Sequence, residues 1–195
     1  MPRITPLTRA DLPDFEAGFE AMAARLGFVP NSNLIMGRQP ELLRAFQAMA
    51  TAVLSPGKVP VELKALIGHV ASTAAGCRYC MAHTGHMSLH RGVAAEKLDA
   101  ILDYAESPLF TPAERTALHI AWGASTVPNT TTDADFAAAR EHWDDDALVE
   151  ITGVIALYGF LNRWNDTIAT ELESDPLRFG RERLAARGWE PGKHG

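Results

Sequence analysis

Residues 60–83 of the chain read PVELKALIGHVASTAAGCRYCMAH, and the predicted fold follows most directly from this stretch. Pro60 precedes apolar residues at helical spacing, which predicts a helix over residues 61–75. Gly76 is the expected stop, because glycine readily adopts the left-handed conformation that ends many helices. A second helix is predicted over residues 77–90, so a Cys-x-x-Cys motif lies where two consecutive helices meet.

The same helical signals continue along the rest of the chain. Capping residues, prolines and glycines delimit further predicted helices at about residues 8–26, 40–54, 96–104, 111–122, 132–143 and 147–172. No stretch alternates apolar and polar residues for long enough to predict a strand. We therefore expect an all-α fold, with a single helical domain over residues 1–175. Residues 176–195 are expected to form a polar C-terminal tail that can hold one last helix.

A weak internal repeat accompanies the helical pattern. Residues 66–80 can be laid over residues 151–165, and the two cysteines then fall on Asn162 and Asn165. Only a glycine, an alanine and an arginine are identical in this register. If the repeat is a duplication, one copy keeps redox chemistry and the other has become structural.

Charge and hydropathy argue against several classes of partner. The chain of 195 residues has 18 Lys and Arg against 24 Asp and Glu and contains no basic cluster, so neither nucleic acid nor an anionic membrane is expected as a main partner. The longest apolar stretch, residues 148–161, includes Glu150 and is too short to span a bilayer. The first residues mix charges and prolines rather than forming an export signal. We therefore expect a cytoplasmic protein.

Both cysteines of the chain lie in the motif Cys77-Arg78-Tyr79-Cys80. Two thiols separated by two residues can cycle between dithiol and disulfide without large backbone movement. Unpaired amides in the first turn of a helix stabilise a thiolate, and Arg78 adds positive charge nearby. Three interpretations follow from the residues: a redox pair, half of a mixed Cys/His metal site, or two inert buried thiols.

Histidines and a glutamate on the same two helices are candidates to assist the thiols. At 100° per residue, His83 lies one turn beyond Cys80 and within reach of it. A metal site would have to combine Cys77, Cys80, His83 and His69, and ligands on consecutive turns rarely converge in this way, so we expect neither a metal nor a cofactor. Glu62 and His69 share a face of the preceding helix and are candidate bases. Their alternatives are a surface charge for Glu62 and a hydrogen-bonded core histidine for His69.

Residues 66–83 resemble the signature of the carboxymuconolactone decarboxylase and alkylhydroperoxidase D-like superfamily. Residues 160–166, FLNRWND, also resemble a segment of its peroxidase-related branch. The resemblance implies an alkylhydroperoxidase D-like helical bundle that assembles as a homo-oligomer, a trimer or hexamer, with a dimer as the other option. It also implies reduction of hydroperoxides, in which Cys80 attacks the peroxide, Cys77 resolves the sulfenic acid and an unknown thiol reductant regenerates the pair.

The chain departs from this family pattern at two positions. The usual glutamate, twelve residues before the first cysteine, is replaced by Ala65, and the usual histidine, four residues after the second cysteine, is replaced by Thr84. The family's proton relay is therefore not carried over intact. In its place we expect His69 or Glu62 to act as the base, with His83 as its partner.

Three functions remain open at this point. The first is a thiol peroxidase, or more generally a thiol–disulfide oxidoreductase. The second is a decarboxylase-like enzyme of the same superfamily, which would not depend on the dithiol. The third is a redox-sensing or binding module without efficient turnover, which the missing relay residues favour.

Overall fold

The two helices that flank the Cys-x-x-Cys motif form as predicted. In the computed structural model, which describes residues 2–195, α4 spans Val61–Ala74 and α5 spans Arg78–His90. Gly76 lies between them with a φ of 71°, in the left-handed region that glycine adopts without strain. Cys77 is the N-cap of α5, and its Sγ accepts a hydrogen bond of 3.4 Å from the backbone N–H of Cys80.

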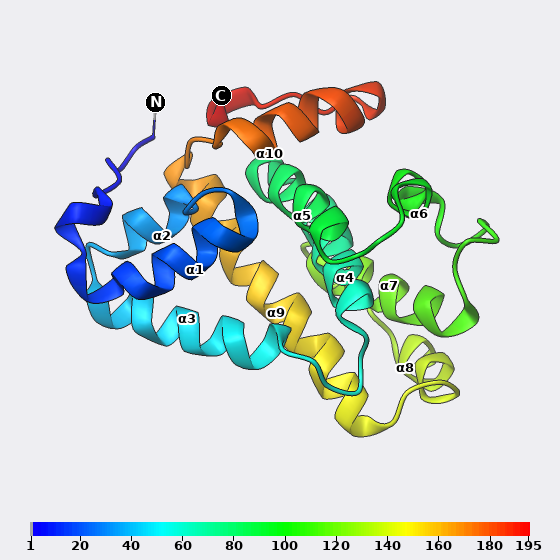
Figure 1. Cartoon of the computed structure of the whole chain (residues 1–195). Coiled ribbons are helices and arrows are strands. Elements are labelled where there is room, and N and C mark those ends of the chain that lie inside the picture. The colour runs from blue at the N-terminus through cyan, green and yellow to red at the C-terminus, as the bar shows by residue number, and fades with distance from the viewer. Residues whose placement is uncertain (1) are drawn as a thin grey trace.

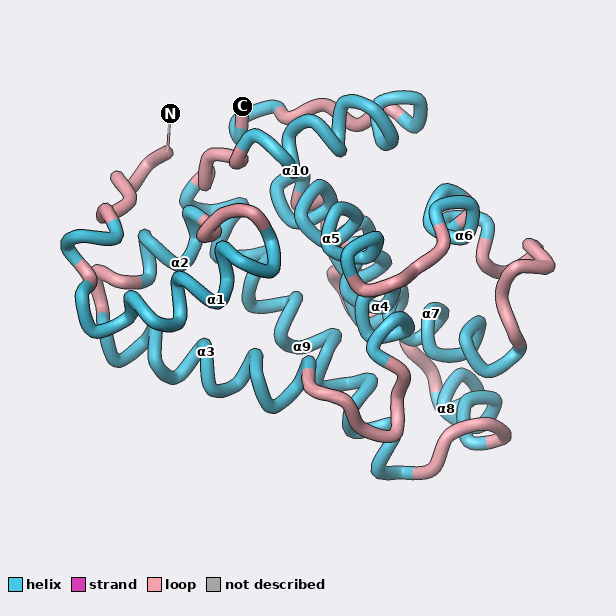
Figure 2. The backbone as a smooth tube through the Cα atoms, viewed as in Figure 1, coloured by secondary structure: helices cyan, strands magenta, loops and turns pink. Residues whose placement is uncertain are grey.

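Helices make up the rest of the fold (Figures 1 and 2). The remaining α-helices are α1 (Glu16–Leu26), α2 (Asn31–Met36), α3 (Pro40–Leu54), α6 (Ala95–Asp99), α7 (Pro112–Ser125), α8 (Asp133–Arg140), α9 (Asp145–Ile168) and α10 (Ser174–Phe179). Within residues 2–195 no residue forms a strand. The predicted all-α class is therefore confirmed.

Helix α4 is the centre of the main core. Every residue from Leu63 to Ser72 is buried, and the helix packs against α5, α7 and α9. Gly68 allows α9 to approach closely, because a Cβ at this position would lie 2.3 Å from the ring of Tyr158. Buried Lys64 is fully paired, with its Nζ bound to two backbone carbonyls and to Glu150. The core is thus closed around the helix that precedes the dithiol.

Helices α1, α2 and α3 lie on the opposite side of α9 from α7 and α8, as Figure 1 shows. They share a second apolar cluster with α9 that includes Phe19, Met36, Leu43 and Leu157. The sequence did not predict α2, because its six residues follow Pro30 and lack a helical apolar pattern. This short helix contributes to the candidate site described below.

The C-terminal segment, expected as a polar tail with room for one last helix, is folded onto the rest of the chain. It forms α10, a π-helical turn and two 3₁₀ turns, and it packs against α5. Phe179 and Trp189 are buried, and the indole N–H of Trp189 donates to the carbonyl of Arg78. These two aromatic side chains hold the segment against α5 in spite of its many charges.

Other differences lie at helix ends. The helix expected from residue 8 begins at Glu16, after two 3₁₀ turns, because Pro13 has no amide hydrogen to donate within a longer helix. Helix α9 ends at Ile168, where Ala169 adopts a φ of 56°. The segment expected at 96–104 is divided between α6 and a 3₁₀ turn. Among residues 2–195, no helix has the length and apolarity needed to cross a membrane.

Candidate active site

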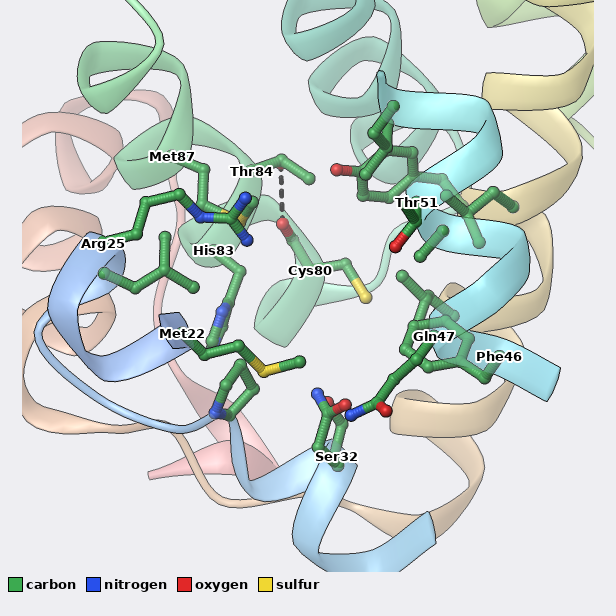
Figure 3. Close-up of a pocket in the computed structure, with 18 of the residues that line it drawn as sticks. Met22, Arg25, Ser32, Phe46, Gln47, Thr51, Cys80, His83, Thr84 and Met87 are labelled. Carbon is green, nitrogen blue, oxygen red and sulfur yellow. Dashed lines mark hydrogen bonds between the residues drawn. The ribbon is translucent and has the colours of Figure 1, made fainter. Parts of the chain in front are cut away.

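The two thiols at the start of α5 have different surroundings. Both are free and buried, with 1% of Cys77 and 3% of Cys80 exposed. Cys80 lines a cavity of about 710 Å³, whereas Cys77 is not among its lining residues. Figure 3 shows the Cys80 sulfur directed into this space. A small molecule in the cavity therefore meets Cys80, with Cys77 placed behind it.

The cavity lies between α5, α9 and the N-terminal helices α1, α2 and α3. Its volume is within the range of sites for small organic ligands. Most of the surface of its wall is apolar, and polar side chains interrupt it. The residues that line it include Met22, Arg25, Ser32, Asn33, Phe46, Gln47, Cys80, His83, Thr84 and Asn165.

Asn165 of α9 is the side chain that contacts the Cys80 sulfur. Its Nδ2 lies 3.6 Å from Cys80 Sγ and also donates to the carbonyl of Leu161. Its Oδ1 is buried without a hydrogen-bond partner. Burial raises the pKa of the Cys80 thiol well above its ordinary value and the Cys77 sulfur raises it further, while Asn165 acts in the opposite direction. Cys80 therefore needs a base, or a bound substrate, to react as a thiolate.

His83 and Glu173 form a buried pair beside the dithiol. His83 Nε2 lies 2.5 Å from Glu173 Oε2, and the two side chains are only 9% and 10% exposed. The hydroxyl of Tyr79 and the backbone N–H of Asn31 both donate to the other carboxylate oxygen. Burial alone would raise the pKa of Glu173, but His83 and the amide of Asn31 outweigh it and lower this pKa. Glu173 is therefore held as a carboxylate against His83.

His69 lies behind the site rather than in it. Its Nδ1 is 2.9 Å from Thr84 Oγ1, and the Thr84 hydroxyl donates to the carbonyl of Cys80. Because Thr84 has a single proton to give, it accepts from His69, which places the imidazole proton on Nδ1. Burial lowers the pKa of His69 to about 4, so the ring is neutral at pH 7. No hydrogen bond links His69 to either sulfur in the described chain.

Glu62 is not brought to the dithiol. Its side chain is exposed, and its carboxylate lies near Gly92, beyond the C-terminal end of α5. This helix of 13 residues is about 20 Å long, and the cysteines are at its other end. Of the predicted residues, the structure gathers Cys77, Cys80 and His83, and it connects His69 through Thr84. In residues 2–195 no group of three or more His, Cys, Asp or Glu side chains is arranged to hold a metal ion.

Comparison with known proteins identifies the family. Residues 40–122 match the model of the carboxymuconolactone decarboxylase family. The apo structure of the debrominase Bmp8 is 36% identical over 92% of this chain and 96% of that protein, with a TM-score of 0.86. The chain belongs to the carboxymuconolactone decarboxylase and alkylhydroperoxidase D-like superfamily.

Other relatives agree in fold. A peroxidase-related protein with an alkylhydroperoxidase AhpD core, from Ralstonia eutropha JMP134, has a TM-score of 0.80 over 92% of this chain and 96% of its own, at 24% identity. An uncharacterized curated relative, YnjA of Escherichia coli K12, is 36% identical over 92 residues. The match with YnjA spans half the length of that protein. The family includes enzymes, so an enzymatic role is consistent with these relatives.

The structure shows what surrounds Ala65 and Thr84, the two positions at which the chain differs from the family pattern. Ala65 is a buried methyl group of α4, and Thr84 bonds to His69 as described above. A carboxylate nevertheless faces His83, supplied by Glu173 from the segment before α10. Sequence reasoning missed Glu173 because ninety residues separate it from His83 and no local pattern connects them. Asn165 lies in the segment that resembles the peroxidase-related branch, which was the available signal for it.

Proposed function

We propose that this chain is a thiol-dependent reductase of small organic electrophiles, with organic hydroperoxides as its first substrate class. The observation that carries the proposal is the placement of the dithiol. The Cys80 sulfur faces a largely apolar cavity, and Cys77 lies immediately behind it, outside the cavity. A substrate therefore reaches one sulfur while the other is held ready to resolve the product.

The reaction transfers two electrons from the dithiol to the O–O bond. The Cys80 thiolate attacks one peroxide oxygen, the O–O bond breaks, and the other oxygen leaves with a proton as the alcohol. Cys80 becomes a sulfenic acid. The Cys77 thiolate then attacks this sulfur, which forms the disulfide and releases water. An external thiol reductant restores both thiols.

Side chains around Cys80 support the proton transfers. His83 lines the same cavity, and Glu173 fixes and polarises its imidazole. The pair is suited to accept the Cys80 proton and return it to the leaving alcohol. The Asn165 amide N–H favours the thiolate, and its unpaired Oδ1 can accept the O–H of a hydroperoxide. His69 and Glu62 have no comparable access to the sulfur.

Reductive dehalogenation is a second candidate, favoured by one relative. A cysteine-to-alanine variant of the debrominase Bmp8, solved with 2,3,4-tribromopyrrole, is 35% identical over 92% of this chain, with a TM-score of 0.87. The same dithiol can supply the two electrons required. An aryl halide and two thiols give the arene, the disulfide and one hydrogen halide, so the halogen is replaced by hydrogen. A flat halogenated ring is also compatible in size with the cavity.

The test is a single-turnover reaction of the reduced protein with one equivalent of cumene hydroperoxide. We expect both thiols to disappear and the mass to fall by about two units, through a Cys77–Cys80 disulfide. Cys80→Ser should abolish the reaction. Cys77→Ser should react once and leave a sulfenic acid on Cys80 that dimedone traps. Thiols that stay free in the wild-type protein, with both the hydroperoxide and tribromopyrrole, would contradict a reductase.

Repeated turnover then separates the enzyme from the alternatives. With excess dithiothreitol, a reductase consumes many equivalents of hydroperoxide, or releases many equivalents of bromide from tribromopyrrole. A redox sensor would oxidise once and turn over slowly. A decarboxylase-like enzyme would retain its activity in the Cys77→Ser, Cys80→Ser double variant, whereas a dithiol reductase loses it.

A further inference from the structure

Besides Asn165, two side-chain amides in the cavity wall each have a buried atom without a hydrogen-bond partner. Asn33 of α2 is 5% exposed and its Oδ1 is buried without a partner, and Gln47 of α3 has a buried Nε2 in the same condition. Both residues line the cavity that Cys80 faces. Leaving a buried polar atom unpaired costs on the order of 1–3 kcal/mol, so such atoms are uncommon in folded proteins.

The two amides belong to the wall that faces α5. In Figure 3 the Gln47 side chain from α3 and Ser32 from α2 lie across the cavity from the helix that holds Cys80. Apolar side chains, Met22 and Phe46, line the same space. The wall therefore presents isolated neutral polar groups in apolar surroundings, an arrangement typical of sites that orient a ligand.

We propose that Asn33 and Gln47 form a polar subsite that recognises an amide-like group of the substrate, one that carries both a hydrogen-bond donor and an acceptor. Asn33 Oδ1 accepts from the ligand and Gln47 Nε2 donates to it. Exchanging oxygen and nitrogen in both amides reverses the two roles and still leaves one donor and one acceptor for the ligand. This deepens the proposed function, since the electrophilic atom at the other end of the molecule would lie at Cys80.

Charge argues for a neutral group rather than a carboxylate. Neither amide carries a charge, and an anion placed between them would be desolvated against Met22 and Phe46 without a counter-ion from the subsite. Two arginines line the cavity, Arg25 of α1, which is exposed to solvent, and Arg91 at the end of α5, which is half-buried. Figure 3 shows Arg25 near Met87 and His83, away from Gln47. A carboxamide, a lactam or a similar neutral group therefore fits the subsite better than an acid.

The test compares cumene hydroperoxide with its para-carboxamide and para-carboxylate derivatives. In the wild-type protein we expect kcat/KM to be roughly tenfold higher for the carboxamide than for the parent, the effect of about one satisfied neutral hydrogen bond. Asn33→Leu and Gln47→Met should each bring this ratio close to one. Met22→Leu, which alters only the apolar wall, should preserve the ratio. Equal rates for carboxamide and parent, or a preference for the carboxylate, would overturn the subsite.

A binding measurement tests the subsite without relying on turnover or on the folding of any single variant. By ligand-observed NMR, benzamide should bind the reduced wild-type protein more tightly than ethylbenzene, and Gln47→Met should remove the difference. If no hydroperoxide or aryl halide is reduced but benzamide binds in this way, the subsite stands and the reductase fails. If hydroperoxides are reduced but benzamide shows no preference over ethylbenzene, the reductase stands and the subsite fails.

Discussion

The two histidines predicted to assist the dithiol have hydrogen-bond partners of different charge. His83 faces the carboxylate of Glu173, while His69 is enclosed by the core and bonded to a neutral hydroxyl. Ring type and helical spacing alone do not distinguish them, and both were predicted as relay residues. The difference comes from what lies opposite each ring, so it becomes visible only in the folded chain.

Acid should destabilise the protein through His69. Its pKa is lowered from 6.5 to about 4 by burial, so between these values the unfolded chain binds a proton that the folded chain excludes. The free energy of unfolding should therefore fall by about 2 kcal/mol from pH 7 to pH 5 on account of this group. Denaturant titrations of wild type and His69→Gln at both pH values measure it. His142→Gln, at an exposed position, is the control and should keep the wild-type pH dependence.

Removing the charge of Glu173 should affect both chemistry and stability. In Glu173→Gln the imidazole of His83 loses its anionic partner, so hydroperoxide reduction should slow roughly 10- to 100-fold at neutral pH. Stability at pH 7 should fall by about 1–2 kcal/mol, because hydrogen bonds to a charged acceptor are replaced by neutral ones. The lowered pKa of Glu173 means that this difference is present at neutral pH and shrinks as the wild-type carboxylate becomes protonated in acid.

The matched control for this substitution is two residues away. Glu171→Gln removes an exposed carboxylate from the same segment and should leave rate and stability near wild type. Peroxide kinetics and urea unfolding of both variants make the comparison. Equal rates for the two variants would exclude a role for the His83–Glu173 pair in proton transfer.

At the level of elements, α5 is held between α4 and the C-terminal segment by close helix contacts. A Cβ on Gly85 of α5 would lie 2.4 Å from the ring of Phe179 at the end of α10 and 3.2 Å from the ring of His69. Neither ring has space to withdraw, since both side chains are buried. The absence of a side chain at this one position lets α10 lie against the helix that carries the dithiol.

Gly85→Ala should therefore destabilise the fold although alanine favours helix. We expect a loss of about 2 kcal/mol from overpacking. Gly159→Ala in α9 is the matched control: a Cβ there meets nothing within 4 Å, so stability should rise by up to about 1 kcal/mol. Thermal unfolding of the two variants decides the sign. A stabilised Gly85→Ala protein would mean that the contact between α5 and α10 is not tight.

The sequence predicted those features of the whole molecule that local patterns encode. Capping residues and apolar spacing located α3, α4, α5 and α7 closely, and the cysteine spacing placed both thiols on one helix. Asn33 and Asn165, which line the cavity, and Glu173, which pairs with His83, lie far from the dithiol in sequence. Their contribution depends on how distant helices pack, which no single-sequence pattern specifies.

The burial of the dithiol under the C-terminal segment has a consequence for how electrons return to the protein. Cys77 lies in one apolar cluster with Trp189 and Leu172, and Cys80, which is 3% exposed, lines the cavity. A folded donor of the thioredoxin type needs to form a mixed disulfide across an open surface, and here no sulfur is presented on one. Reduction of the disulfide should therefore favour small thiols that enter the cavity as the substrate does. Substrate and reductant would then compete for the same cavity, and excess hydroperoxide should slow its own turnover.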